Sequence, residues 1–221
     1  MSAHLKLAQY DAQLRLKYGP YICGVDECGR GSWAGPIVAA ACVLPPDAML
    51  PGLNDSKKMT PETREKLAED IRGIALAFSI VEIPNHRIDK NGLNPCNALC
   101  MLQSSQDVAD SIMASTGEPI SVFVVDQSPP FKLHPHLMMS KADGTSLAVA
   151  AASVIAKTWR DNLMKDLAKE FPLYHWDTSM GYINDEHKNA VLAHGLTRFH
   201  RRSYQVTGVN KPRQVSFDEL M

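Results

Sequence analysis

One segment constrains the fold of this chain more than any other: Ile120–Asp126, which reads ISVFVVD. Its β-branched and aromatic residues follow one another almost without interruption, and such a run predicts a buried β-strand. The strand ends at an acid, Asp126. The fold therefore depends on which other apolar segments pair with this strand, and the site depends on which other acids lie at the same edge.

Four further segments predict strands, and segments with helical patterns separate or follow them. The predicted strands are Tyr21–Asp26, Pro36–Leu44, Ile74–Ile83 and Leu137–Lys141. The predicted helices cover residues 3–18, 60–72, 94–115 and 145–169. Strands that gather early and then alternate with helices predict an α/β fold with a mixed five-stranded sheet flanked by helices. We expect residues 1–172 to form this domain and residues 173–221 to form a small helical C-terminal extension.

Composition excludes several other classes of protein. With 45% hydrophobic and 21% charged residues, the chain can bury a full core, which argues against disorder. The longest apolar runs, Ile37–Leu44 and Ala148–Ala156, are far shorter than the roughly 20 residues that span a bilayer. The N-terminal residues contain no compact apolar segment of a signal peptide. We therefore expect a soluble, cytoplasmic protein without membrane contact.

The five cysteines are an odd number scattered along the chain, which favours free thiols in a reducing compartment over a disulfide framework. Cys96 and Cys100 lie one helical turn apart, as two zinc ligands do. No second pair of ligands lies near them in the sequence, so buried structural thiols are the favoured interpretation.

Acidic residues follow the predicted strands in a regular way. Asp26, Asp126 and Asp143 each lie at or just after the C-terminal end of an apolar segment, and in an open α/β sheet ligands bind at that edge. With Glu27 they make four carboxylates, whose mutual repulsion a cation would neutralise. Oxygen ligands suit Mg²⁺ or Mn²⁺, and two such ions between carboxylates can hydrolyse a phosphodiester.

Asp26 and Glu27 are neighbours, and successive side chains of a strand point to opposite faces. Both reach one site only if the strand breaks between them, and we expect Gly29-Arg30-Gly31 to supply that break. Glycines there would also expose backbone N–H groups beside the metal ions, in reach of a phosphate or a sugar hydroxyl. A tight turn without a ligand is the plain alternative.

The net charge of −1 does not by itself suggest a polyanion as a partner, but the charges are unevenly distributed. Residues 187–213 contain six Lys and Arg residues and no acid. Such a segregated basic segment is typical of contact with a phosphate backbone, and equally of a solvated helix end, so both interpretations stay open.

The run GVDECGRGSWAGPIVAAACVL (Gly24–Leu44) resembles the first signature of ribonuclease HII, the type 2 ribonuclease H. Four more segments resemble the same family and follow in its order: LNDSKKMTPETREKL, VVDQ, KADGTSLAVAAASVIAKTWRD and GYINDEHKNAVLAHGLTRFHRRSY. The resemblance covers about residues 20–205. It implies a ribonuclease H-like fold and cleavage of the RNA strand of RNA–DNA hybrids. It also implies cleavage at single ribonucleotides in duplex DNA, leaving 5′-phosphate and 3′-OH ends.

The resemblance also assigns roles to individual residues. It implies four metal-binding carboxylates, a loop that senses the ribose 2′-OH, a tyrosine that stacks on the neighbouring sugar, and a lysine that contacts a phosphate. In this sequence the matching residues are Asp26, Glu27, Asp126 and Asp143, then Gly29, Arg30 and Gly31, then Tyr182 and Lys57. A 2′-OH is what distinguishes RNA from DNA at one position, so one loop and one ring suffice to read it.

The chain departs from the family pattern at several positions. Gln127 and Ala142 stand beside the third and fourth acids where the family usually has glycine, and Ser32-Trp33 replaces the more usual Pro-Leu. None of these changes removes a ligand. Two alternatives stay open: another nuclease of the same fold, such as a junction resolvase, and a catalytically inactive nucleic-acid binder.

Three other features favour supporting roles. Asp161 lies four residues from both Lys157 and Lys165, a spacing that predicts ion pairs along a helix. Residues 200–202, His-Arg-Arg, suggest backbone contact or docking of the terminal segment. The tail Gln214–Phe217 faintly resembles the short peptides that bind a sliding clamp, although a free or packed terminus is the default. The family suggests a monomer.

Overall fold

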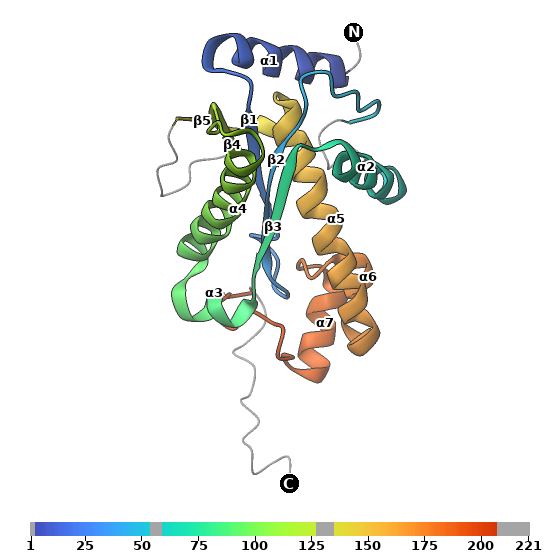
Figure 1. Ribbon diagram of the computed structural model, residues 1–221. Coiled ribbons are helices and arrows are strands. Elements are labelled where there is room, and N and C mark those ends of the chain that lie inside the picture. The colour runs from blue at the N-terminus through green and yellow to red at the C-terminus, as the bar shows by residue number, and fades with distance from the viewer. Residues whose placement is uncertain (1–2, 54–58, 127–134, 207–221) are drawn as a thin grey trace.

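The computed structural model describes residues 3–53, 59–126 and 135–206 (Figure 1). Five strands form one sheet in the order β3-β2-β1-β4-β5. β1 pairs antiparallel with β2, and β2 with β3, whereas β1 pairs parallel with β4, and β4 with β5. This confirms the predicted mixed five-stranded sheet. Its strands are β1 (Ile22–Cys28), β2 (Ile37–Val43), β3 (Ala77–Ile83), β4 (Val122–Asp126) and β5 (His136–Met139).

Helices cover both faces of the sheet: α4 packs on one face, and α5, with α2 beside it, on the other (Figure 1). α1 lies across one end, where the Asp11 carboxylate accepts a hydrogen bond from the Ala148 N–H at the start of α5. The helices are α1 (Ala3–Tyr18), α2 (Pro61–Ile74), α3 (Asn85–Asn91), α4 (Leu93–Thr116), α5 (Leu147–Glu170), α6 (Trp176–Ser179) and α7 (Asp185–His194).

The middle of the sheet is buried on both faces, which explains why its strands read as continuous apolar runs. Along β2, Val38 and Ala40 pack toward α5, and Ile37 and Ala39 pack toward α4. On β1, Gly24 lies against the α5 backbone, and a Cβ atom there would lie 2.1 Å from the Ala148 carbonyl carbon. This close contact sets α5 directly over the strand that carries Asp26.

The predicted elements are present, but several of their bounds differ, and one helix was not predicted. The predicted strand Ile74–Ile83 begins later, because α2 continues to Ile74 and the Ala75 N–H still bonds to the Ile71 carbonyl. β5 begins and ends earlier than the predicted Leu137–Lys141. The short helix α3 was not expected: it ends at Gly92, whose φ of 87° only glycine adopts readily.

The region after α5 packs on the main body through an aromatic cluster. Tyr174 and Trp176, near the turn η3 (Pro172–Tyr174), pack with Trp33, which follows β1, and with Met164 of α5. α6 and α7 make this a small helical extension, as predicted. The division into two domains at residue 172 stays a prediction.

All five cysteines are free thiols, as expected. The Cys100 Sγ donates to the Val81 carbonyl at 3.0 Å, and the Cys96 Sγ donates to the Arg87 carbonyl at 3.4 Å. This confirms that both thiols are structural. Among the described residues, none of the helices combines the length and the apolar character needed to cross a membrane.

Candidate active site

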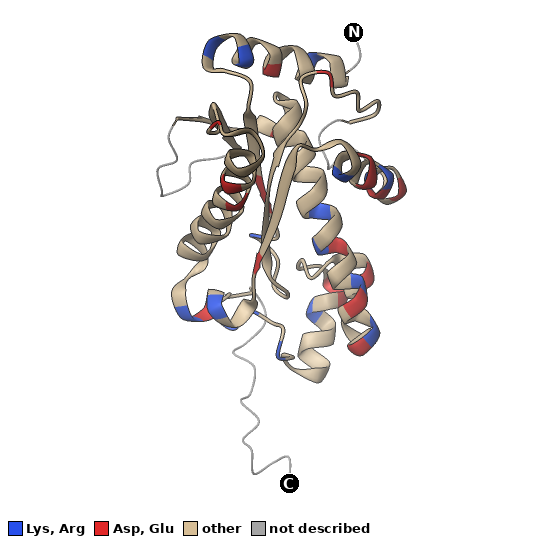
Figure 2. Ribbon diagram, in the orientation of Figure 1, with Lys and Arg blue, Asp and Glu red and all other residues tan. Residues whose placement is uncertain are grey.

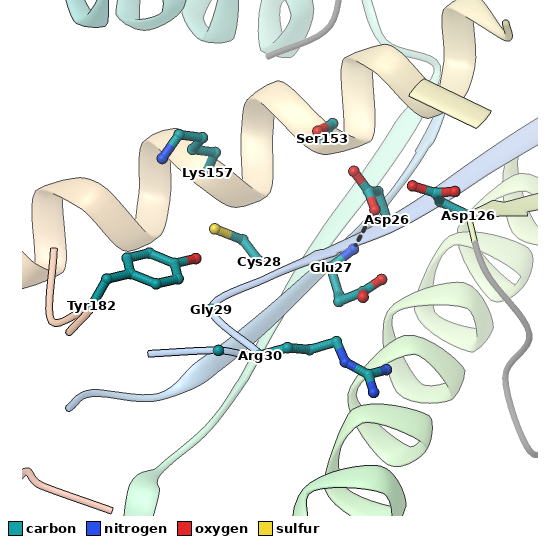
Figure 3. A pocket seen from close by; sticks show the side chains of 10 residues that line it. Asp26, Glu27, Cys28, Gly29, Arg30, Asp126, Ser153, Lys157 and Tyr182 are labelled. Carbon is teal, nitrogen blue, oxygen red and sulfur yellow. Dashed lines mark hydrogen bonds between the residues drawn. The ribbon is translucent and has the colours of Figure 1, made fainter. Parts of the chain in front are cut away.

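A cavity of about 410 Å³ lies where β1 and β4 end and the chain turns toward β2 (Figure 3). Seven of its ten lining residues are ones that the sequence singled out. The full lining is Asp26, Glu27, Cys28, Gly29, Arg30, Gly31, Asp126, Ser153, Lys157 and Tyr182. Residues separated by up to 156 positions in the chain thus share one cavity (Tyr182 against Asp26).

The register of two parallel strands brings Asp26 and Asp126 together. β1 and β4 pair from Ile22 opposite Val122 to Val25 opposite Val125, so the next residue on each strand is an aspartate at the same level. Both side chains lie on the face that α5 covers, and Figure 3 shows their carboxylates side by side. The parallel pairing of β1 with β4 therefore produces this acid pair.

Glu27 reaches the same cavity by a different route from the one expected. The predicted break after Asp26 is wrong: β1 runs on to Cys28, and both acids pair with β2, Asp26 opposite Ala40 and Glu27 opposite Ala39. Their side chains point to opposite faces, as a strand requires. Both line one cavity because the described pairing of β1 with β4 ends at Val25, so the cavity extends around that edge of β1.

Burial and the two neighbouring acids act together on the pKa of Asp26. Burial raises the pKa of Asp26 well above its ordinary value, and the negative charges of Glu27 and Asp126 raise it further. A hydrogen bond from Ser153 of α5 and another from the Glu27 N–H, at 2.8 Å, lower the pKa in part. A carboxylate whose ionisation is made costly by burial and by two neighbouring acids belongs to a site that a divalent cation stabilises.

The turn after β1 is fixed by a glycine and a buried arginine. Gly29 has a φ of 91°, and a Cβ atom there would lie 2.2 Å from the Arg160 Nε. The Ser32 hydroxyl donates to the Gly29 carbonyl at 2.9 Å and accepts from Arg160 at 2.7 Å. The Arg30 side chain extends below Glu27 in the view of Figure 3, and its guanidinium donates to the Asn94 side chain at 3.2 Å. Ser32, a departure from the family pattern, thus ties the turn to α5.

Tyr182 forms the opposite wall of the cavity (Figure 3). The Arg160 guanidinium carbon lies 5.4 Å from the centre of its ring. Although 37% of the residue is exposed, desolvation around the hydroxyl, together with the Cys28 thiol beside it, raises the pKa of Tyr182 to about 12. The phenol is therefore neutral at pH 7.

Two lining residues on α5, Ser153 and Lys157, were not predicted to belong to the site. They lie one helical turn apart, on the face of α5 that meets the cavity. The sequence shows this spacing, but it does not show which face of the helix meets the cavity. The Lys157 Nζ also contacts the Asp161 carboxylate at 3.1 Å, and Arg64 of α2 contacts it at 2.7 Å. The supporting role of Asp161 is confirmed. Lys165 pairs with Glu65 instead, at 3.0 Å.

Asp143 is placed close to the acids without lining the cavity. It lies buried in the turn η2 (Ala142–Gly144), and the Asp126 carboxylate accepts a hydrogen bond from the Ala142 N–H at 3.1 Å. The turn therefore abuts the end of β4, and the metal-binding role of Asp143 stays a prediction. Lys57 and Gln127 lie outside the described residues.

One arginine of the basic C-terminal segment is engaged inside the fold, and another forms an ion pair at the surface. Arg201 is fully buried and donates to the carbonyls of Arg30, Gly35 and Pro36. Arg198 pairs with Glu170 at 2.6 Å. This confirms docking of the terminal segment for His200 and Arg201, both fully buried. Arg198 and Arg202 are exposed, and Figure 2 marks the Lys and Arg positions along the ribbon of this segment in blue.

The donor set fits hard divalent cations. Oxygen ligands on three acids share the cavity, and their repulsion is the kind that a cation relieves. Within the described chain, no three His, Cys, Asp or Glu side chains converge on one ion position. Mg²⁺ is usually held by one or two carboxylates, with water and substrate phosphates completing its shell.

Solved structures place the chain in the class of ribonuclease H-like folds. The ribonuclease H2 from Pyrococcus horikoshii OT3 superposes with a TM-score of 0.68 at 23% identity, covering 84% of this chain and 94% of that one. A chain of the PCNA:RNase HII complex from Archaeoglobus fulgidus superposes with a TM-score of 0.63 at 24% identity, covering 90% of this chain and 99% of that one. Bst-RNase HIII in complex with Mn²⁺ superposes with a TM-score of 0.62 at 18% identity, covering 79% of this chain and 70% of that one.

Sequence comparison then defines the family. The family model for Ribonuclease HII matches residues 23–207. The Ribonuclease HII of Halalkalibacterium halodurans is 38% identical over 202 residues, which are 91% of this chain and 74% of that protein. The Ribonuclease HII of Geobacillus kaustophilus is 39% identical over 199 residues, which are 90% of this chain and 74% of that protein. The chain belongs to the ribonuclease HII family, so it is a metal-dependent ribonuclease H that hydrolyses the RNA strand of RNA–DNA hybrids.

Proposed function

We propose that this ribonuclease H also cleaves at single ribonucleotides embedded in duplex DNA, on their 5′ side, leaving 5′-phosphate and 3′-OH ends. One observation supports this most: acids suited to phosphate chemistry share a cavity with a turn and a ring suited to one sugar. The groups are Asp26, Glu27 and Asp126, then residues 29–31, then Tyr182. A cavity of this kind has the parts to read one 2′-OH and to cut beside it.

For the chemistry, Asp26, Glu27, Asp126 and Asp143 would hold two Mg²⁺ or Mn²⁺ ions, Asp143 from its place in η2. When bound, such ions activate the attacking water and stabilise the leaving oxygen. The chain itself contributes rigidity: two of the carboxylates are carried on paired strand ends, and Ser153 holds the Asp26 side chain. No protein nucleophile is needed.

For recognition, the backbone of residues 29–31 would contact the ribose 2′-OH, and the Tyr182 ring would stack on the next sugar. The turn suits this role because Gly29 and Gly31 leave its backbone without side-chain cover, and Arg160 holds it from behind. Lys57, outside the described residues, would contact a backbone phosphate.

Partners and organisation complete the proposal. The solved PCNA:RNase HII complex concerns the Archaeoglobus fulgidus protein, and we propose that Gln214–Phe217 of this chain makes a comparable contact with a sliding clamp. That tail lies outside the described residues. A variant ending at residue 206 would then lose clamp binding in a pull-down assay and keep hybrid cleavage. We further propose a cytoplasmic monomer whose residues 173–221 contribute to substrate binding.

The test is cleavage of a DNA duplex that holds one ribonucleotide, with Mg²⁺ or Mn²⁺ and with EDTA. We expect one cut, 5′ to the ribonucleotide, that EDTA abolishes and the added ion restores. An all-DNA duplex and a branched DNA junction are the controls and should stay intact. Cleavage of the junction, or hybrid cleavage without any cut at the single ribonucleotide, would contradict the proposed specificity.

A further inference from the structure

The chain that carries Tyr182 is bent sharply and fixed through its backbone. Met180 and Gly181 both have positive φ angles, 50° and 76°, and such a conformation at Met180 needs support from its surroundings. Arg160 donates to the Met180 carbonyl at 2.8 Å, and the Trp33 N–H donates to the Gly181 carbonyl at 2.8 Å. The carbonyl of the next residue, Tyr182, contacts a histidine ring instead.

That partner is His187 of α7, whose Nδ1 lies 2.9 Å from the Tyr182 carbonyl oxygen. A carbonyl only accepts hydrogen bonds, so this contact is a bond only if His187 carries its proton on Nδ1. The neighbours of the two buried histidines, His187 and His200, decide that question.

The first constraint comes from Thr197. Its backbone N–H, which can only donate, lies 2.9 Å from the His200 Nδ1. The His200 Nδ1 must therefore be the acceptor, and a neutral His200 carries its proton on Nε2. That Nε2 lies 3.0 Å from the His187 Nε2.

The second constraint comes from Trp176, whose indole N–H also only donates and lies 3.0 Å from the same His187 Nε2. Two donors, Trp176 and His200, thus converge on this nitrogen, which must lack a proton. The proton of His187 is then on Nδ1 and is donated to the Tyr182 carbonyl. The ring protons of both histidines are thus assigned by neighbouring N–H groups that can only donate.

The surroundings keep both rings neutral. His187 and His200 are fully buried among Trp33, Tyr174 and Trp176, with ring centres 5.2 to 6.4 Å apart. Burial lowers the pKa of His187, and burial together with the neighbouring His187 lowers the pKa of His200 to about 3. The hydrogen bonds that link Thr197, His200, His187 and the Tyr182 carbonyl therefore persist at neutral pH.

We propose that His187 is a positioning residue for ribonucleotide recognition: its Nδ1–H, fixed by His200 and Trp176, holds the Tyr182 carbonyl and thereby the ring at the cavity wall. His187 itself is fully buried and does not line the cavity. The inference rests on the proposed role of Tyr182. It assigns to the aromatic cluster of the C-terminal extension a part in specificity as well as in packing.

Two isosteric substitutions separate the two sides of the His187 ring. The His187→Asn amide nitrogen takes the place of Nδ1, so the donor to Tyr182 is kept and the acceptor for Trp176 is lost. The His187→Gln amide reaches the place of Nε2, so an acceptor for Trp176 is kept and the donor to Tyr182 is lost. The readout is the ratio of kcat/KM on a single-ribonucleotide duplex to kcat/KM on a continuous hybrid, with Tm measured for each variant.

We expect the ratio to fall about 3- to 10-fold in His187→Gln, the effect of one hydrogen bond, and to stay at the wild-type value in His187→Asn. Tm should change in the opposite order, with His187→Asn the less stable because the Trp176 N–H loses its acceptor. Ratios that simply follow Tm would mean a structural role only and would overturn the inference.

Tyr182→Ala keeps the two proposals distinguishable. If Tyr182→Ala lowers the ratio and His187→Gln does not, the positioning role of His187 fails while the proposed function stands. If Tyr182→Ala leaves the ratio unchanged, the proposed recognition by Tyr182 fails, and the inference fails with it.

The wild-type protein offers a test that needs no variant. Long-range ¹H–¹⁵N correlation spectra of the histidine rings show which nitrogen carries the proton. We expect the Nδ1–H form for His187 and the Nε2–H form for His200 between pH 6 and 8, chosen as roughly neutral conditions. An Nε2–H form of His187, or a protonated ring, would contradict the assignment directly.

Discussion

The acidic end of the sheet and the basic C-terminal segment, residues 187–206, use their charges in opposite ways. At the sheet end, Asp26, Glu27 and Asp126 share a cavity, and the negative charges of Glu27 and Asp126 add to the burial that raises the pKa of Asp26. In the C-terminal segment, Arg201 is buried and its donors are taken up by carbonyl groups. The first region gathers several acids in one cavity, whereas in the second the buried Arg201 guanidinium is satisfied by backbone carbonyls.

The difference teaches which of the two regions carries the chemistry. Groups that repel one another inside a fold are costly unless a ligand relieves them, so such a cluster indicates a function. A buried guanidinium whose nitrogens all donate to groups of the protein, as those of Arg201 do, needs no ligand. In this chain the second region supports the first, because Arg201 donates to the carbonyl of Arg30 in the turn beside the acids.

The largest effect is expected from removing one charge of the acidic cluster. Asp126→Asn should lower kcat on an RNA–DNA hybrid about a thousandfold or more, because several kcal/mol of charge stabilisation are lost. Binding of the hybrid, measured by fluorescence anisotropy in Ca²⁺, should persist. Asp166→Asn, an exposed acid of α5 paired with Lys169, is the control and should cleave normally. Near-normal cleavage by Asp126→Asn would remove this acid from the site.

Two neighbouring arginines of the basic segment, one buried and one exposed, test whether the buried guanidinium stabilises the fold. Arg201→Met should lower the free energy of unfolding by about 3 kcal/mol, because buried carbonyls lose their donors. Arg202→Met, with an exposed side chain, should change it by about 0.5 kcal/mol or less. Urea denaturation measures both. Equal losses in the two variants would show that the buried guanidinium is not the stabilising group.

Two glycines of the same turn make a third matched pair. Gly29→Ala should destabilise the fold by about 2 kcal/mol and lower cleavage, since its φ is 91° and its Cβ would meet Arg160. Gly31→Ala should cost little stability, because its nearest neighbour, a Tyr182 ring carbon, would lie 3.9 Å away. Thermal melts with and without Mg²⁺ measure the difference, and a Gly29→Ala variant as stable as Gly31→Ala would contradict it.

The smallest effect concerns pH and the metal-free protein. Because the pKa of Asp26 is raised in the folded state, the folded protein binds more protons than the unfolded chain, so this group destabilises the fold as pH rises. In EDTA at pH 7, Asp26→Asn should therefore raise the free energy of unfolding by about 1 kcal/mol. The gain should shrink as the pH falls toward 4. A gain that stays constant from pH 7 to 4 would argue against repulsion as its cause.

The sheet and its acidic edge were predictable because both depend on local patterns. Ile120–Asp126 and Tyr21–Asp26 read as buried strands ending at acids, and parallel pairing places such ends together. What the sequence did not show was how far β1 runs. Glu27 lies in the strand and reaches the cavity around its edge, a result of where β4 stops pairing.

The rest depended on tertiary packing, which no local pattern encodes. Lys157 and Ser153 were not expected in the site because helical spacing does not say which face meets the sheet. No role was predicted for His187, and backbone contact or docking was predicted for residues 200–202, because the hydrogen bonds with Trp176 and Thr197 form only in the folded chain. A basic segment likewise looks the same in sequence whether its arginines are buried or exposed.

The most direct test of the account is a crystal of the protein with a ribonucleotide-containing duplex and Mn²⁺, examined by anomalous scattering. The account predicts manganese peaks between the carboxylates of Asp26, Glu27 and Asp126, with the ribonucleotide at the turn of residues 29–31. A cavity with no manganese peak, or manganese bound elsewhere while the duplex is in place, would contradict the central claim.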